Sequence, residues 1–177
     1  MEVTFFDVGQ GDSAFIESPQ GQQVLIDGGP GSKVLEKLGK EMPFWDRSID
    51  LVILSHPEKD HLQGLLEVLK KYKVNYVLWS GVKRDTAEYD EWVRLLREKK
   101  LNVKIAVAGQ KIKLGKVELD VISPFESQEG EIFDDSNNSS VVLKLIFGND
   151  SFLFTGDISK SVEQDLVSNN SDINSDV

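Results

Sequence analysis

Both histidines of the chain lie in one short stretch, and this is the strongest chemical signal in the sequence. Glu58 and Asp60 lie between His56 and His61. Imidazole and carboxylate ligands together suit zinc, manganese or iron. If the side chains of the loop alternate in direction, His56 and Glu58 face one ion while Asp60 and His61 face a second. The stretch therefore predicts a site for two divalent metal ions, with Asp60 and His61 as its catalytic residues.

An interpretation without metal is also open for each acidic residue that could join this site. Asp60 could cap a helix that starts near Leu62, which would leave the histidines incidental. Asp157 follows Gly156, and Gly-Asp is a common turn pair. Asp27 precedes two glycines and could be a turn residue for the same reason.

Hydrophobic periodicity and turn signals predict the elements that must position these residues. The almost continuously apolar stretch Ile49 to Leu54 predicts a buried strand that delivers the chain to His56. The other expected strands are Val3 to Asp7, Ser13 to Glu17, Gln22 to Asp27, Val74 to Trp79, Val103 to Val107, Lys111 to Leu114, Lys116 to Ser123, Ser140 to Phe147 and Ser151 to Thr155. The expected helices are Lys33 to Lys40, Leu62 to Tyr72, Thr86 to Lys100 and Lys160 to Val167. Alternation of strands and helices in the middle of the chain predicts an α/β layer.

Composition limits the chemistry further. The 177 residues, 40% of them hydrophobic, fit one globular domain. The chain has no cysteine, so any metal must be held by nitrogen and oxygen. A net charge of −10 opposes broad nucleic-acid binding unless divalent cations compensate locally. No apolar run approaches ~20 residues and no signal pattern is present, so we expect a soluble chain, cytoplasmic as encoded. The alternative is an extracytoplasmic soluble domain of a membrane protein.

Five motifs in sequence order resemble one known family. The stretch His56-Pro57-Glu58-Lys59-Asp60-His61 resembles the His-x-His-x-Asp-His metal motif of the metallo-β-lactamase-like superfamily, with Glu58 in place of the second histidine. Within that superfamily the chain resembles the soluble domain of the ComEC competence proteins and their stand-alone relatives. The supporting segments are Phe6 to Ser13, Leu25 to Gly29, Asn137 to Leu143 and Phe152 to Asp157, and the resemblance spans Val3 to about Val167.

The resemblance implies an αββα sandwich of the α/β (α+β) class, with the metal site at one edge between two sheets. It implies that Asp157 bridges the two metals and that Asp27 braces the metal loop without ligating. Asp12, Asn138 and Ser140 are expected to line the pocket.

The activity that the resemblance implies is metal-dependent hydrolysis, by a metal-bound hydroxide, of DNA or another phosphodiester. Association with a membrane DNA-uptake channel is a further expectation. The carboxylate of Glu58 shifts the preference towards harder ions such as manganese or magnesium. We expect two divalent ions, zinc or manganese.

The C-terminus departs from the family pattern. The family continues, after the segment that corresponds to Lys160 to Val167, with a strand and a histidine-bearing segment, whereas this chain ends at Val177. We therefore expect a C-terminally incomplete domain over residues 1–167, followed by a polar tail or truncated connection over residues 168–177. The competing hypothesis is a degenerate or truncated, non-catalytic binding module with the same fold.

Overall fold

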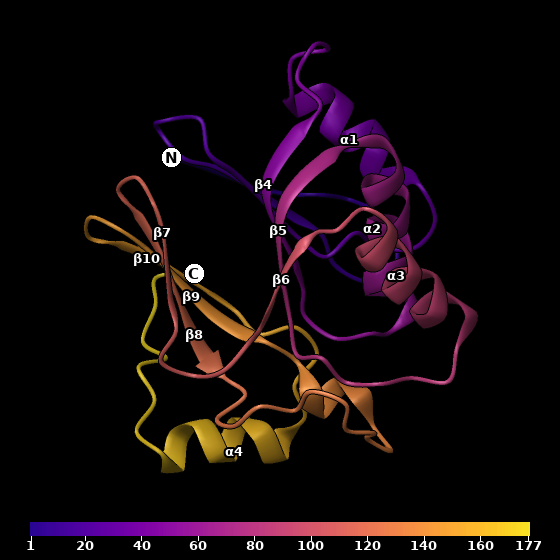
Figure 1. Cartoon of the computed structure of the whole chain (residues 1–177). Helices are drawn as coiled ribbons and strands as arrows, with labels where there is room; N and C mark the ends of the chain where they lie inside the picture. The colour runs from indigo at the N-terminus through magenta and orange to yellow at the C-terminus, as the bar shows by residue number, and fades with distance from the viewer.

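Two β-sheets packed face to face form the centre of the computed structural model, which describes residues 1–177 (Figure 1). The first sheet has the strand order β1-β2-β3-β4-β5-β6, antiparallel from β1 to β3 and parallel from β3 to β6. The second sheet is antiparallel throughout, in the order β10-β9-β8-β7. The strands are β1 (Glu2–Phe5), β2 (Ala14–Glu17), β3 (Gln23–Ile26), β4 (Ser48–Leu54), β5 (Lys73–Trp79), β6 (Asn102–Ile105), β7 (Lys111–Leu114), β8 (Val117–Ser123), β9 (Val142–Phe147) and β10 (Asp150–Phe154).

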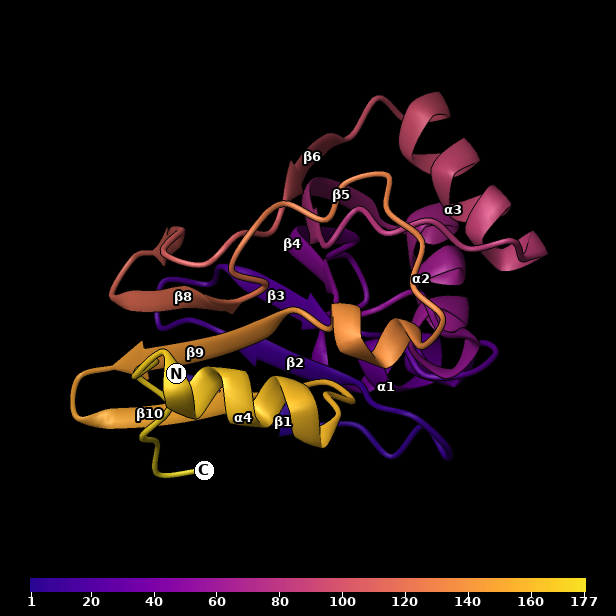
Figure 2. The ribbon, with the colours of Figure 1, turned by 90° about the horizontal axis from the view of Figure 1, so that it is seen from below.

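Helices cover the outer side of each sheet, which gives the expected α/β sandwich of four layers. The first sheet is covered by α1 (Lys33–Glu41), α2 (Lys59–Lys71) and α3 (Ala87–Glu98). The fourth helix, α4 (Lys160–Ser168), lies beside the second sheet (Figure 2). A 3₁₀ helix, η1 (Ser136–Ser139), precedes β9. None of these helices is both long and apolar enough to cross a bilayer.

The first sheet is buried on both faces, which explains why β4 is almost continuously apolar. Val52 and Leu54 belong to a core cluster shared with α1, α2 and α3. Leu51 and Ile53 point the other way and pack in a second cluster with residues of β8 and β9. A strand with two buried faces needs apolar residues at successive positions.

A close contact between β3 and α2 fixes the position of the metal loop. Gly64 donates its backbone N–H to the Gly29 carbonyl at 2.8 Å, and Gly28 donates to the His61 carbonyl at 2.9 Å. A β-carbon on Gly64 would lie 2.0 Å from the Gly28 carbonyl oxygen, so only glycine permits this approach. The first turn of α2 is therefore held against the end of β3, beside Asp27.

The start of α2 differs from the sequence prediction. The helix begins at Lys59, before the expected Leu62, so Asp60 and His61 lie in its first turn and Asp60 is not the cap. Glu58 occupies the N-cap position without a side-chain capping bond, and its carbonyl accepts hydrogen bonds from the amides of His61 and Leu62. An acidic residue in the first turn is favourable for the helix dipole.

The polar C-terminal segment is attached to the second sheet and is not a free tail. Asp172 pairs at 2.7 Å with Lys144, whose side chain is buried on the face of β9 opposite the core between the sheets. Leu153 donates its backbone N–H to the Val177 carbonyl at 2.8 Å, and Val177 donates to the Ser151 carbonyl at 3.2 Å. The last residues therefore cover the outer edge of β10.

Candidate metal centre

Three side chains from distant parts of the sequence converge where the two sheets meet. His56 follows β4, His61 lies in the first turn of α2, and Asp157 follows β10. One ligand atom from each lies within 4.8 Å of the other two. The imidazole rings have centroids 4.2 Å apart, and Nε2 of His61 lies 3.6 Å from Oδ1 of Asp157. Both histidines are 1% exposed, whereas the Asp157 side chain is 45% exposed and open to a ligand.

A buried network centred on Asp27 orients both imidazoles. Oδ1 of Asp27 accepts the Ser55 backbone N–H at 2.8 Å, and Oδ2 accepts the Ser55 hydroxyl at 2.6 Å. Nδ1 of His61 also lies 2.9 Å from Oδ2 of Asp27. Asp27 is 1% exposed and adopts a φ of 55°, which few residues other than glycine adopt. Such backbone strain is typical of functional sites.

The hydrogen bonds assign the tautomers of the two histidines. An ionised Asp27 can only accept, so Nδ1 of His61 must carry the proton of their bond. The single hydroxyl proton of Ser55 is used on Asp27, so this oxygen accepts from Nδ1 of His56, 3.0 Å away. Both Nδ1 atoms are therefore donors. The Nε2 atoms are left facing the gap beside Asp157.

The donor set at this gap fits a divalent cation. Nε2 of His56 and Nε2 of His61 are both buried and have no hydrogen-bond partner. Buried polar atoms without a partner are costly in a folded protein, so each needs an explanation. Two imidazole nitrogens and one carboxylate are a donor set that suits zinc or manganese. A bound cation would satisfy both nitrogens.

The local charges shift the pKa values around the gap. Burial opposes protonation of His61, but its hydrogen bond to Asp27 and the negative charge of Asp27 outweigh burial and raise its pKa to about 9. Burial, followed by the charge of His61, lowers the pKa of His56. Burial also raises the pKa of Asp12; the charge of His61 opposes this shift and the charge of Asp157 reinforces it. Asp12 therefore lies within electrostatic reach of the group.

Glu58 and Asp60 lie outside this group of three, so the structure pairs the residues differently from the alternating arrangement expected from the sequence. Nη2 of Arg84 lies 2.6 Å from Oε1 of Glu58, which also accepts the Ser136 hydroxyl. The helix that begins at Lys59 places Asp60 and His61 in its first turn, with the His61 ring against that of His56. The Asp60 backbone packs against Gly11, where a β-carbon would lie 2.0 Å from the Asp60 carbonyl oxygen.

The remaining expected pocket residues lie around Gly156. A β-carbon on Gly156 would lie 3.1 Å from the side chains of both Ser140 and Ser55, so Ser140 is next to the turn that carries Asp157. The Ser140 hydroxyl is buried without a partner. Asn138 lies two residues before Ser140 in the sequence, and its side-chain oxygen accepts a hydrogen bond from the Ser159 hydroxyl. A pocket of about 210 Å³ lies alongside, lined by Asp12, Asp27, Gly156 and aromatic residues of β1 and β10.

Sequence reasoning missed three residues of this region. Ser55 links Asp27 to His56, and its signal was its position between a buried strand and a histidine. Arg84 and Ser136 hold Glu58, but Arg84 lies in a loop and Ser136 at the start of η1, both far along the chain and in no local pattern. Their contact with the metal loop follows only from the packing of the two sheets.

A family comparison decides the lineage of this fold and site. The sequence model of the metallo-beta-lactamase superfamily matches residues 6–176 of the chain. The chain belongs to the metallo-beta-lactamase superfamily. This lineage places the chain among metal-dependent hydrolases, and the superfamily fold implies binding of a divalent metal.

Individual relatives agree with this assignment. ComE operon protein 3 of Bacillus subtilis (strain 168) is 30% identical over an alignment 194 residues long, which covers 99% of this metallo-beta-lactamase domain. The chain spans only 24% of the length of that relative.

Solved structures of other proteins share the fold. The metallo-beta-lactamase fold protein YhfI from Bacillus subtilis aligns with a TM-score of 0.56 and 18% identity, over 85% of this chain and 57% of its own. Metallo-beta-lactamase SMB-1, bound to 2-mercaptoethanesulfonate, aligns with a TM-score of 0.57 and 16% identity, over 94% of this chain and 68% of its own. CmlA, a diiron beta-hydroxylase from Streptomyces venezuelae, aligns with a TM-score of 0.53 and 21% identity, over 88% of this chain and 30% of its own.

Proposed function

We propose that the chain is a metal-dependent phosphodiesterase whose cation is held by His56, His61 and Asp157. The observation that carries the proposal is the pair of buried Nε2 atoms without partners beside an accessible carboxylate. A divalent cation at such a site supplies Lewis-acid polarisation and neutralises charge as water attacks a phosphoester.

The residues around the cation have distinct roles in the proposal. Asp27 and Ser55 accept the Nδ1 protons of the two imidazoles and direct both Nε2 atoms towards the metal position, and such supporting contacts hold ligand geometry. Asp12 borders the pocket, and burial raises the pKa of its carboxyl group. For a second ion we propose Glu58 and Asp60 as additional ligands. Binding there requires Glu58 to exchange its bond to Arg84 for the metal.

One observation supports a phosphodiester, with DNA as the preferred substrate, and the main objection to a polyanion has an answer. The chain is 30% identical to ComE operon protein 3, in agreement with the resemblance of its motifs to ComEC competence proteins. The net charge of −10 repels polyanions, so a site that concentrates divalent cations supplies the attraction that the rest of the surface lacks. Association with a membrane DNA-uptake channel is part of the same proposal.

The test combines metal content with hydrolysis by the purified chain. Inductively coupled plasma mass spectrometry measures bound zinc and manganese, and bis-p-nitrophenyl phosphate and single-stranded DNA serve as substrates. We expect metal-dependent turnover that His61→Ala and Asp157→Asn both abolish. Asp165→Asn, an exposed aspartate on α4, is the matched control and retains full activity. Undiminished turnover in His61→Ala would refute the proposal.

A non-catalytic metal-binding module is the second candidate. It is favoured by the position of Glu58, which is held by Arg84 and Ser136 away from the histidines. This candidate predicts specific binding of one equivalent of metal and no hydrolysis of either substrate at any metal concentration. Metal content and turnover measured on the same preparation therefore separate the two candidates.

A further inference from the structure

An exposed aromatic pair marks the end of the first sheet opposite the metal centre. Phe44 and Trp45 lie in the turn between α1 and β4 and are 79% and 72% exposed. Their rings contact each other edge to face, with centroids 4.8 Å apart. Trp79 and Trp92 are buried, so Trp45 is the exposed tryptophan of the chain. Two adjacent exposed rings are an expensive feature for a surface that meets only water.

A cluster of lysines lies at the same end of the sheet. Lys70, Lys71, Lys73, Lys99 and Lys100 line a hollow of about 530 Å³ formed by the ends of α2 and α3 and the starts of β5 and β6. Lys70 pairs with two glutamates, and the other four have no ion pair. Lysines at helix C-termini are favourable for the helix dipole alone. That reason does not cover Lys73, which lies in β5.

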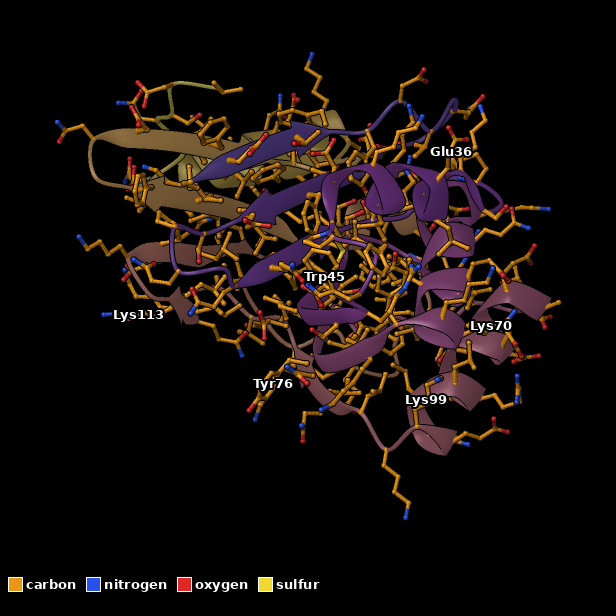
Figure 3. All side chains as sticks on the ribbon, turned by 90° about the horizontal axis from the view of Figure 1, so that it is seen from above. Glu36, Trp45, Lys70, Tyr76, Lys99 and Lys113 are labelled. Carbon is orange, nitrogen blue, oxygen red and sulfur yellow. The ribbon has the colours of Figure 1, made fainter.

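The segment that follows the aromatic pair contacts the segment that carries Lys73. Lys73 donates its backbone N–H to the carbonyl of Arg47, two residues after Trp45, at 2.8 Å. The Arg47 guanidinium lies 5.5 Å from the centre of the Tyr72 ring and donates to its hydroxyl at 3.1 Å. Figure 3 shows Trp45, Lys70 and Lys99 on the face seen from above. We call the surface formed by Phe44, Trp45 and the five lysines the aromatic–lysine face.

Asp46, which follows the aromatic pair in the sequence, has its own hydrogen-bond partners. The carboxylate of Asp46 accepts hydrogen bonds from the amide and hydroxyl of Ser48 and from the Gln23 side chain. These hydrogen bonds hold the carboxylate beside β3 and β4 but leave its negative charge in place. The five lysines concentrate positive charge at this end of the sheet, on a chain with a net charge of −10.

We propose that the aromatic–lysine face docks on an anionic lipid surface. Phe44 and Trp45 enter the interfacial layer, where aromatic rings are favoured, and the lysines lie over the phosphate headgroups. Single-stranded nucleic acid attracts lysines too, but its bases stack on aromatic rings spaced along a groove. Here the two rings lie in one turn and pack on each other edge to face, so they form a compact protruding pair and no extended surface on which successive bases could stack.

The orientation that results leaves the metal centre accessible. β4 starts at Ser48 beside the aromatic–lysine face and ends at Leu54, two residues before His56. A strand of this length separates the two surfaces by about 20 Å. A chain docked by its aromatic–lysine face therefore presents the metal centre away from the lipid. The proposal does not depend on the proposed hydrolysis.

Vesicle binding by the purified chain tests the proposal. We expect co-sedimentation with vesicles of equal parts phosphatidylcholine and phosphatidylserine, and none with phosphatidylcholine alone. Trp45 is the reporter: its emission shifts to the blue on binding, and brominated phosphatidylcholine within the anionic vesicles quenches it. Lys71→Gln with Lys73→Gln lowers the partition coefficient about 30-fold, from ~1 kcal/mol for each lysine. Phe44→Ser abolishes the blue shift.

Matched controls keep the result specific. Ile132→Ser removes a side chain that is 78% exposed in a loop before η1, and Lys116→Gln with Lys160→Gln removes two exposed lysines from other elements. Both control variants bind vesicles like the parent. Absence of binding to anionic vesicles would overturn the proposal, as would equal losses in the control variants. Tight binding of an oligothymidylate that needs Trp45 and Lys73, without lipid binding, would assign the face to nucleic acid and also overturn it.

Discussion

Replacing Asp27 by asparagine tests whether one buried carboxylate sets the chemistry of both histidines. Asparagine has nearly the same shape, but it presents an amide donor where Asp27 accepts from Ser55 and His61. His61 then accepts at Nδ1 and carries its proton on Nε2, the atom that must be free for a metal. Loss of such a supporting group typically costs 10- to 100-fold in metal affinity. We expect a loss at the upper end of that range because Asp27 supports both imidazoles.

The same substitution removes the charge that stabilises a protonated His61. The difference between the ordinary pKa of 6.5 and the value of about 9 corresponds to ~3 kcal/mol of preference for the imidazolium. Asp27→Asn should therefore destabilise the metal-free protein by a few kcal/mol at neutral pH, as measured by urea unfolding.

Metal affinity is measured by calorimetric titration with zinc and with manganese. Asp50→Asn is the control, since Asp50 also accepts from a backbone amide and a side-chain amide on the first sheet but lies far from the histidines. If Asp27→Asn binds metal as tightly as the parent and Asp50→Asn, the tautomer argument is wrong.

Three further perturbations follow from the geometry. His61 should make a constant contribution to the unfolding free energy of the metal-free protein below about pH 6.5. That contribution, ~3 kcal/mol, should be lost as the pH rises through about 9, because a raised pKa stabilises only the protonated form. Gly64→Ala should destabilise the protein by ~1–3 kcal/mol in thermal or urea unfolding, because its β-carbon meets the end of β3. Gly39→Ala in α1, which meets open space, should stabilise it by up to ~1 kcal/mol. Arg84→Ala should free Glu58 and tighten binding of a second metal equivalent by about fivefold in calorimetric titration.

Each of these perturbations has an outcome that contradicts it. A flat stability profile between pH 7 and about 9 would mean that His61 and Asp27 do not form a charged pair. Equal effects of alanine at Gly64 and Gly39 would mean that α2 does not depend on its close approach to β3. A second metal that binds no better to Arg84→Ala than to the parent would exclude Glu58 as a ligand held in reserve.

The sequence predicted the elements because their hydrophobic patterns are local. The apolar run of β4 identified a strand buried on both faces, and the superfamily fold was confirmed. The start of α2 was missed because its N-cap residue is Glu58, which makes no side-chain capping bond. Serine, threonine, asparagine and aspartate are the preferred N-cap residues by which a helix start is recognised in a sequence.

The metal centre was predictable only in part. His56 and His61 stand out by their spacing, and Asp157 was found only through the resemblance of its motif to a known family. The contacts of Glu58 with Arg84 and Ser136 depend on the tertiary packing of segments far apart in the sequence, and no local sequence pattern predicts them. The ligand roles of Glu58 and Asp60 stay predictions.

The convergence of Asp157 with the histidines couples the metal centre to the order of folding. The first sheet consists of strands in sequence order, so its contacts form early and locally, and it carries both histidines. Asp157 arrives only when β10 docks on that sheet. If Asp157 is a ligand as we propose, we expect full metal affinity only after the two sheets have docked, and we expect a bound cation to slow their separation. Metal release during unfolding should thus report the opening of this interface before the helical side of the first sheet melts.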